Sequence, residues 1–72
     1  MKWTPNDIKA ELVRKGITQS DIARSRGVSV AQVNRVINYG VVSDHVRREI
    51  AQRLGVSVEE IWPEYYLARM AG

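Results

Sequence analysis

The sequence contains no cysteine, and no apolar run in it approaches the roughly 20 residues that a membrane-spanning helix needs. Without cysteine, neither a disulfide nor a thiolate metal site can stabilise the fold. The residues after Met1 also lack the apolar core of a secretory signal peptide. Together these absences favour a cytoplasmic protein, and we expect no membrane partner.

The side-chain groupings that catalysis requires are also missing. There is no nucleophile beside a base, no carboxylate cluster and no phosphate-binding loop, and the single histidine, His45, has no cluster of potential ligands around it in the sequence. A chain of 72 residues leaves little room for a pocket. We therefore expect no enzymatic activity, no cofactor, no metal and no small-molecule substrate.

What the sequence does have is a modest excess of positive charge. Eleven Lys and Arg residues outnumber eight Asp and Glu residues, which gives a net charge of +3. Residues 1–53 hold ten of these basic residues against five acids. A basic body of this kind suits a polyanion such as nucleic acid, although an ordinary solubilising surface would have the same charge.

Start and stop signals divide the chain, which we interpret as one domain spanning 1–72, into five short helices. The expected N-caps are Thr4, Thr18, Ser29, Ser43 and Ser57, and the expected terminating glycines are Gly16, Gly27 and Gly55. Thr18 with Asp21, and Ser57 with Glu60, have the spacing of capping boxes. Without strand pairs, this pattern predicts a compact all-α bundle; Val41-Val42 fits either a short wing or loop packing.

Apolar residues recur at helical spacing and define the expected core. They are Ile8, Leu12, Ile17, Ile22, Ala23, Val28, Val33, Val36, Ile37, Val46, Ile50, Leu54, Val58 and Ile61, with Val13 as a candidate addition. We interpret Trp3 and Trp62 as core residues that close the two ends of the chain. A rival interpretation assigns a dimer contact to Trp62 and to three residues of the C-terminal tail (63–72), namely Tyr65, Tyr66 and Leu67. Arg47, Arg48 and Arg53 are expected on a solvated face.

Residues 18–38 have the form of a helix-turn-helix, with the motif ending by residue 39. Gly27 is expected in a left-handed conformation at the turn, and small Ala23 lets the two helices cross closely. The residues expected to read base edges are Val30, Ala31, Gln32, Asn34 and Arg35. The residues expected at DNA phosphates are Thr18, Gln19, Ser29, Asn38 and His45.

These base-reading roles follow from side-chain chemistry. Arg35 can bridge O6 and N7 of guanine, and Asn34 or Gln32 can pair with N6 and N7 of adenine. Val30 can touch only a thymine methyl group. Each residue type is also common on ordinary surface helices, so the interpretation depends on their grouping on one helix.

The 18–38 pattern, followed by Leu54-Gly55-Val56-Ser57-Val58-Glu59-Glu60-Ile61, resembles the lambda-repressor-like DNA-binding domains of the Cro/repressor class. Trp3, Pro5, Asp7 and Ile8 near the start, with Ile61-Trp62-Pro63 near the end, look like the Ner-type regulators of Mu-like phages. The resemblance spans almost the whole chain. It implies a small phage or prophage regulator, typically a repressor, that binds double-stranded operator DNA in the bacterial cytoplasm, and hence at the nucleoid, without a cofactor.

Three positions depart from the pattern of these domains. Arg26 stands where an apolar residue usually precedes the turn glycine, so its stem is expected to cover the core while its head reaches water or phosphate. Val30 opens the recognition helix where several repressors have a glutamine, and Tyr39 stands where a glycine often ends that helix.

Several functional alternatives stay open at this level. Two copies would bind half-sites about one turn apart, either as a homodimer or as monomers that pair on DNA. An antitoxin or an activator would share the same sequence features as a repressor, because the sign of regulation lies in operator position. A helical protein-interaction module is a further alternative, which the polar outer side of the recognition helix disfavours.

Overall fold

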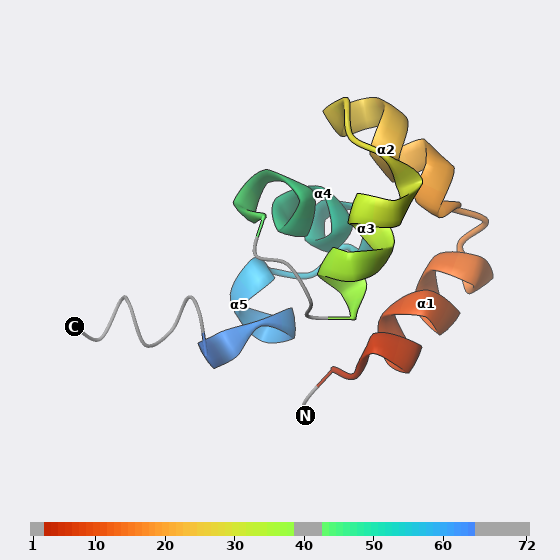
Figure 1. Ribbon diagram of the computed structural model, residues 1–72. Helices are drawn as coiled ribbons and strands as arrows, with labels where there is room; N and C mark the ends of the chain where they lie inside the picture. The colour runs from red at the N-terminus through yellow and green to blue at the C-terminus, as the bar shows by residue number, and fades with distance from the viewer. Residues whose placement is uncertain (1–2, 39–42, 65–72) are drawn as a thin grey trace.

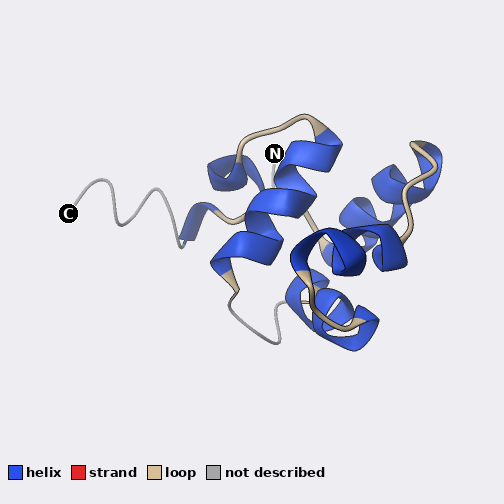
Figure 2. Cartoon of the chain, turned by 90° about the horizontal axis from the view of Figure 1, so that it is seen from above, coloured by secondary structure: helices blue, strands red, loops and turns tan. Residues whose placement is uncertain are grey.

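The computed structural model describes residues 3–38 and 43–64. They form five α-helices, namely α1 (Pro5–Arg14), α2 (Gln19–Arg26), α3 (Val30–Ile37), α4 (Asp44–Leu54) and α5 (Val58–Ile61) (Figure 1). The described ranges contain helices and loops and no strand (Figure 2). The predicted all-α, five-helix fold is confirmed, whereas Tyr39, Val41-Val42 and the tail beyond Glu64 lie outside the described residues.

Side chains at the helix starts act largely as expected. Thr4 and Thr18 each accept a hydrogen bond from the backbone N–H three residues later, and Asp7 and Asp21 reach back to complete both capping boxes. Ser29 Oγ accepts from the N–H of Gln32 at 3.1 Å. These bonds satisfy backbone donors that each helix start would otherwise leave exposed.

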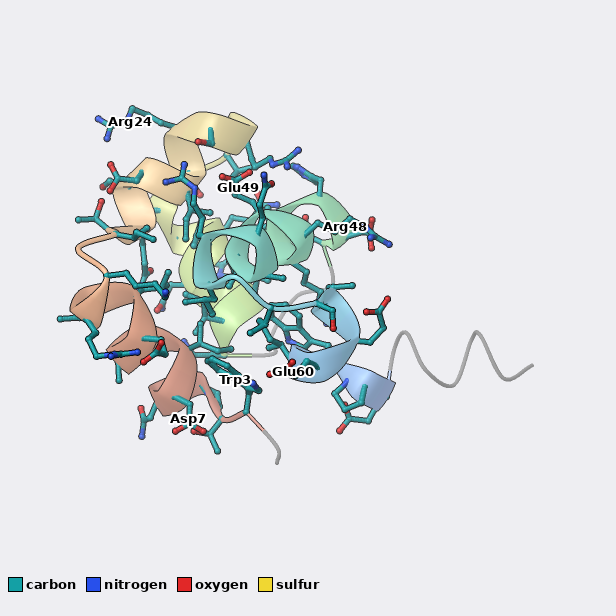
Figure 3. All side chains as sticks on the ribbon, turned by 180° about the vertical axis from the view of Figure 1, so that it is seen from behind. Trp3, Asp7, Arg24, Arg48, Glu49 and Glu60 are labelled. Carbon is teal, nitrogen blue, oxygen red and sulfur yellow. The ribbon has the colours of Figure 1, made fainter. Side chains whose placement is uncertain are left out.

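The capping box expected at Ser57 is wrong, because no side-chain cap hydrogen bond forms there. The carboxylate of Glu60 instead accepts a hydrogen bond from Trp3 Nε1 at 3.3 Å. Trp3 and Glu60 lie next to each other in Figure 3. The side chain of Glu60, which local spacing assigned to the cap, therefore joins the two ends of the chain instead.

The turn between α2 and α3 consists of Gly27, Val28 and Ser29. Gly27 has φ +65°, in the left-handed region, and the N–H of Val28 donates to the carbonyl of Ala23 at 3.0 Å. Val28 then packs against the core. The expected helix-turn-helix geometry is thus built from a left-handed glycine, an apolar plug and a serine cap.

The core contains every aliphatic residue expected there, with Ile17 and Val28 partly buried at its margin. Ala51 and Trp62 complete it, and Trp62 is only 1% exposed. Trp62 is therefore a core residue, as interpreted, and the rival placing of its side chain in a dimer contact is wrong. Val13, the candidate addition, is 77% exposed and does not belong to the core; α1 buries Ile8 and Leu12, and Val13 lies about 100° beyond Leu12.

Helix α4 lies at the centre of the bundle and packs against each of the other four helices. This position explains why Arg47 is only 1% exposed. The expectation that Arg47 lies on a solvated face is therefore wrong. Its guanidinium lies over the ring of Trp62, 5.3 Å from the ring centroid. Arg48, by contrast, is exposed and pairs with Asp44 on the same helix at 2.8 Å.

Glu49 joins α2 to α4 through two arginines. Its carboxylate accepts from Arg53 Nε at 2.7 Å and from Arg26 Nε at 3.0 Å, and Arg53 also donates to Ser25 Oγ at 2.7 Å. Arg26 is exposed to water as expected, and it also reaches a carboxylate that the sequence did not predict. The hydrogen bond from Arg53, assisted by that from Arg26, holds the pKa of Glu49 below its ordinary value of 4.5 against the opposing effect of burial.

Replacing Glu49 by Gln should lower the free energy of unfolding by about 2 kcal/mol at pH 7, because it removes the charge that both arginines contact. The side chain is only 11% exposed, so water replaces these contacts poorly. Urea denaturation followed by circular dichroism measures the change. Glu11→Gln is the matched control, since its partner Arg14 is exposed to solvent and the loss should be clearly smaller.

The difference in stability between wild type and Glu49→Gln should also depend on pH. Because the pKa of Glu49 is lower in the folded state, its contribution is complete above pH 4.5 and is lost as the pH falls through the folded-state pKa. The stability difference between wild type and Glu49→Gln should therefore shrink as the pH falls below 4.5. A difference that stays constant down to pH 2 would contradict the assigned ion pairs.

Replacing Gly27 by Ala should cost about 1 kcal/mol, because an L-residue is strained at φ +65°. A Cβ atom there would meet no other atom within 4 Å, so the cost comes from the backbone alone. Gly27→Asn should lose less, since asparagine tolerates this conformation better. Thermal unfolding of both variants tests this, and an alanine variant as stable as wild type would refute it.

Candidate nucleic-acid interface

The rotation of α3 about its axis determines which of its side chains face outward. Val33, Val36 and Ile37 have no exposed surface and pack between α1, α2 and α4. Successive residues turn by about 100°, so Ala31, Asn34 and Arg35 lie on the opposite side. These three exposed residues form what we call the outer face of α3, and this helix contains no acidic residue.

The two remaining candidates for base reading lie at the edges of this outer face. Val30 is 45% exposed and lies on the side of Asn34, whereas Gln32 is half-buried on the side of Arg35. The structure thus brings all five expected residues onto the accessible part of one short helix. A helix of this kind fits the width of the DNA major groove.

The residues expected at phosphates lie at four places, namely the starts of α2, α3 and α4 and the end of α3. The hydroxyls of Thr18 and Ser29 accept hydrogen bonds from their own helix starts, yet each retains an O–H that can donate to an anion. Gln19 is the first residue of α2, and His45 is an exposed residue in the first turn of α4. Asn38 directly follows α3 as its C-cap.

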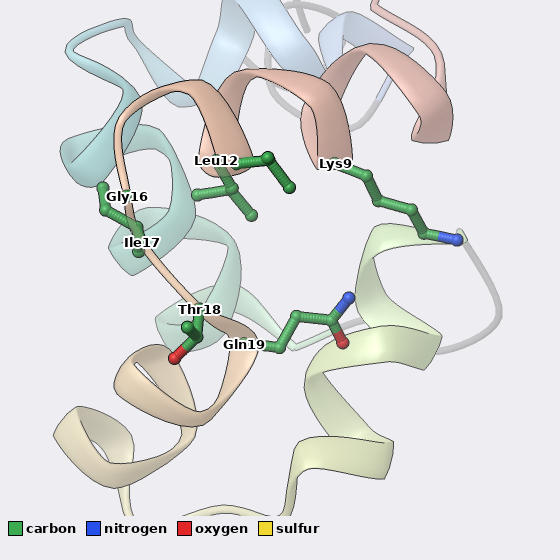
Figure 4. A pocket seen from close by; sticks show the side chains of 7 residues that line it. Lys9, Leu12, Gly16, Ile17, Thr18 and Gln19 are labelled. Carbon is green, nitrogen blue, oxygen red and sulfur yellow. The ribbon is translucent and has the colours of Figure 1, made fainter.

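One basic residue beside the outer face was missed by sequence reasoning. Lys9 extends from α1 toward the C-terminal end of α3, where its Nζ donates to Asn38 Oδ1 at 3.4 Å (Figure 4). From the sequence, Lys9 was considered only as part of the net charge. Its place directly after buried Ile8 was the available signal, because that puts it at the margin of the buried side of α1.

A hollow of about 480 Å³ opens between α1 and the start of α2. Leu12 and Ile17 supply apolar lining, and the polar side chains of Lys9 and Gln19 extend toward α3 (Figure 4). Within residues 3–38 and 43–64, no three His, Asp or Glu side chains gather where they could hold a metal ion. The same ranges contain no helix long and apolar enough to cross a membrane.

Comparison with known proteins supports the DNA-binding interpretation. The sequence matches the family described as winged helix-turn-helix DNA-binding over residues 2–71, which is nearly its whole length. No curated protein and no solved structure matches the chain. The chain therefore belongs to the winged helix-turn-helix DNA-binding family.

Proposed function

We propose that this member of the winged helix-turn-helix DNA-binding family is a sequence-specific transcriptional regulator that inserts α3 into the major groove of operator DNA. The outer face of α3 carries this proposal. It presents an arginine, an amide and a small alanine, and aliphatic packing behind it prevents the helix from turning away. In this geometry α2 lies across the DNA backbone.

Each side chain then has a role that matches its position. Arg35 binds O6 and N7 of a guanine, and the short side chain of Ala31 allows α3 to approach the base edges closely. Val30 and Gln32 contact bases at the two edges of the helix. The residues proposed at phosphates are Thr18, Gln19, Ser29 and His45, whose hydroxyl, amide, imidazole and helix-start N–H groups are suitable partners, whereas the Nδ2 of Asn38 already donates to Asn34.

The resemblance to lambda-repressor-like domains and to Ner-type regulators supports a more specific role. On this proposal the protein is a phage or prophage repressor in the bacterial cytoplasm, and it blocks transcription by occupying a promoter. Two copies bind half-sites about one helical turn apart. Selection of bound sequences from a random DNA pool tests this, since it yields both the recognised sequence and its symmetry.

Binding to the selected operator should weaken about tenfold or more between 50 and 200 mM salt, as expected when at least two phosphates are neutralised. Gel-shift or fluorescence-anisotropy titrations at several salt concentrations measure this dependence. Random DNA of the same length is the control and should bind more weakly. Binding that neither weakens with salt nor distinguishes the operator from random DNA would refute the proposed function.

Replacing Arg35 by Ala should weaken operator binding by about 1–3 kcal/mol and relax the preference at one base position. The loss follows from removing a guanidinium that donates to two acceptors of one guanine. Arg48→Ala is the matched control, because it removes the same charge from an exposed arginine on α4 that pairs with Asp44. Equal losses in the two variants, with unchanged base preference, would contradict a reading role for Arg35.

A further inference from the structure

A chain of hydrogen bonds leads from α1 to the outer face of α3. Lys9 Nζ donates to Asn38 Oδ1 at 3.4 Å. The Nδ2 of Asn38 in turn donates to two oxygens of Asn34, the backbone carbonyl at 2.9 Å and the side-chain Oδ1 at 3.3 Å. All three side chains are at least partly exposed, so the chain lies at the surface of the candidate interface.

The groups at the two ends of this series of hydrogen bonds determine its direction. The lysine ammonium can only donate, so the oxygen of Asn38 must face Lys9. The backbone carbonyl of Asn34 can only accept, so the nitrogen of Asn38 must face Asn34. Both requirements give the same orientation of the Asn38 amide, and the side chain of Asn34 must then turn its own oxygen toward that nitrogen.

This orientation leaves a donor pointing outward. The oxygen and nitrogen of an amide diverge from one carbon, so the Nδ2 of Asn34 points away from Asn38. It has no hydrogen-bond partner among the described residues and lies on the exposed side of α3. The nitrogen of Asn38, by contrast, has two acceptors, both of them on Asn34, which ties it to that residue.

We propose that Lys9 and Asn38 are positioning residues that hold the Asn34 amide with its N–H outward, so that this position of the operator must present a hydrogen-bond acceptor. Guanine through O6 and N7, thymine through O4 and adenine through N7 do so in the major groove, whereas cytosine presents only an amine. A bidentate contact with adenine needs both amide atoms to face the base, and here the oxygen faces Asn38. The inference rests on the proposed function and specifies its base preference.

The first experiment locates the base that Asn34 contacts. Binding of wild type and Asn34→Ala is measured against the selected operator and all its single-base variants. We expect Asn34→Ala to relax one position, at which wild type prefers guanine, thymine or adenine over cytosine by about tenfold. Unchanged preferences at every position in Asn34→Ala, or a wild-type preference for cytosine at the relaxed position, would overturn the inference.

The second experiment reverses the hydrogen-bond chain with Asn38→Asp. An aspartate has no donor for Asn34 but can still pair with Lys9 and keep its place. The Asn34 amide then turns to donate to Asp, which leaves its oxygen outward to accept from the N4 amine of cytosine. We expect the preference at that position to reverse in favour of cytosine, and Asn38→Ala, which holds Asn34 in neither orientation, to abolish it.

Asn6→Asp is the matched control, because it makes the same chemical change on an exposed residue in the first turn of α1. It should leave the order of base preferences unchanged, whatever its effect on overall affinity. If Asn38→Asp and Asn38→Ala also keep the wild-type order while their urea midpoints show intact folding, the positioning role is wrong. Failure of wild type to bind any DNA specifically would instead refute the proposed function itself.

Discussion

The packing of α3 onto the core is the constraint on which the candidate DNA interface depends. Val33, Val36 and Ile37 are completely buried, and an eight-residue helix can bury these three together in only one rotation. The side chains of the outer face are therefore selected by aliphatic packing on the opposite side. A rotation by one residue, about 100°, would expose an aliphatic residue and bury an amide or a guanidinium, at the cost of an unpaired polar group.

Helix α4 supports that packing from the centre of the bundle. Aliphatic contacts have no intrinsic direction, so they determine burial better than they determine crossing angle. Polar contacts from the same helix add direction. Glu49 connects α4 to Arg26 at the end of α2, just before the turn, and Arg47 lies over Trp62. The turn at Gly27 is thus held next to a two-arginine ion-pair network.

The candidate interface extends beyond the helix-turn-helix. Lys9 belongs to α1, yet its ammonium contacts the residue that ends α3, and the hollow beside it is lined by both α1 and the start of α2. On the proposed function Thr18 and Ser29 would act in two ways, because the hydroxyls that cap α2 and α3 also lie at the helix starts where phosphates are expected. Structural roles and proposed recognition roles would then share the same atoms.

The helices, the turn and nearly the whole core were predictable from the sequence, because caps, left-handed glycines and aliphatic spacing act over a few residues. The sequence also grouped the outward residues of α3 correctly. The exposure of Val13, the burial of Arg47 and the partner of Glu60, which is 57 residues away in the chain, depend instead on how the helices pack together. The same holds for the contact of Lys9 with Asn38, 29 residues apart. Such contacts depend on how helices cross, and the periodicity of a single helix carries no information about that.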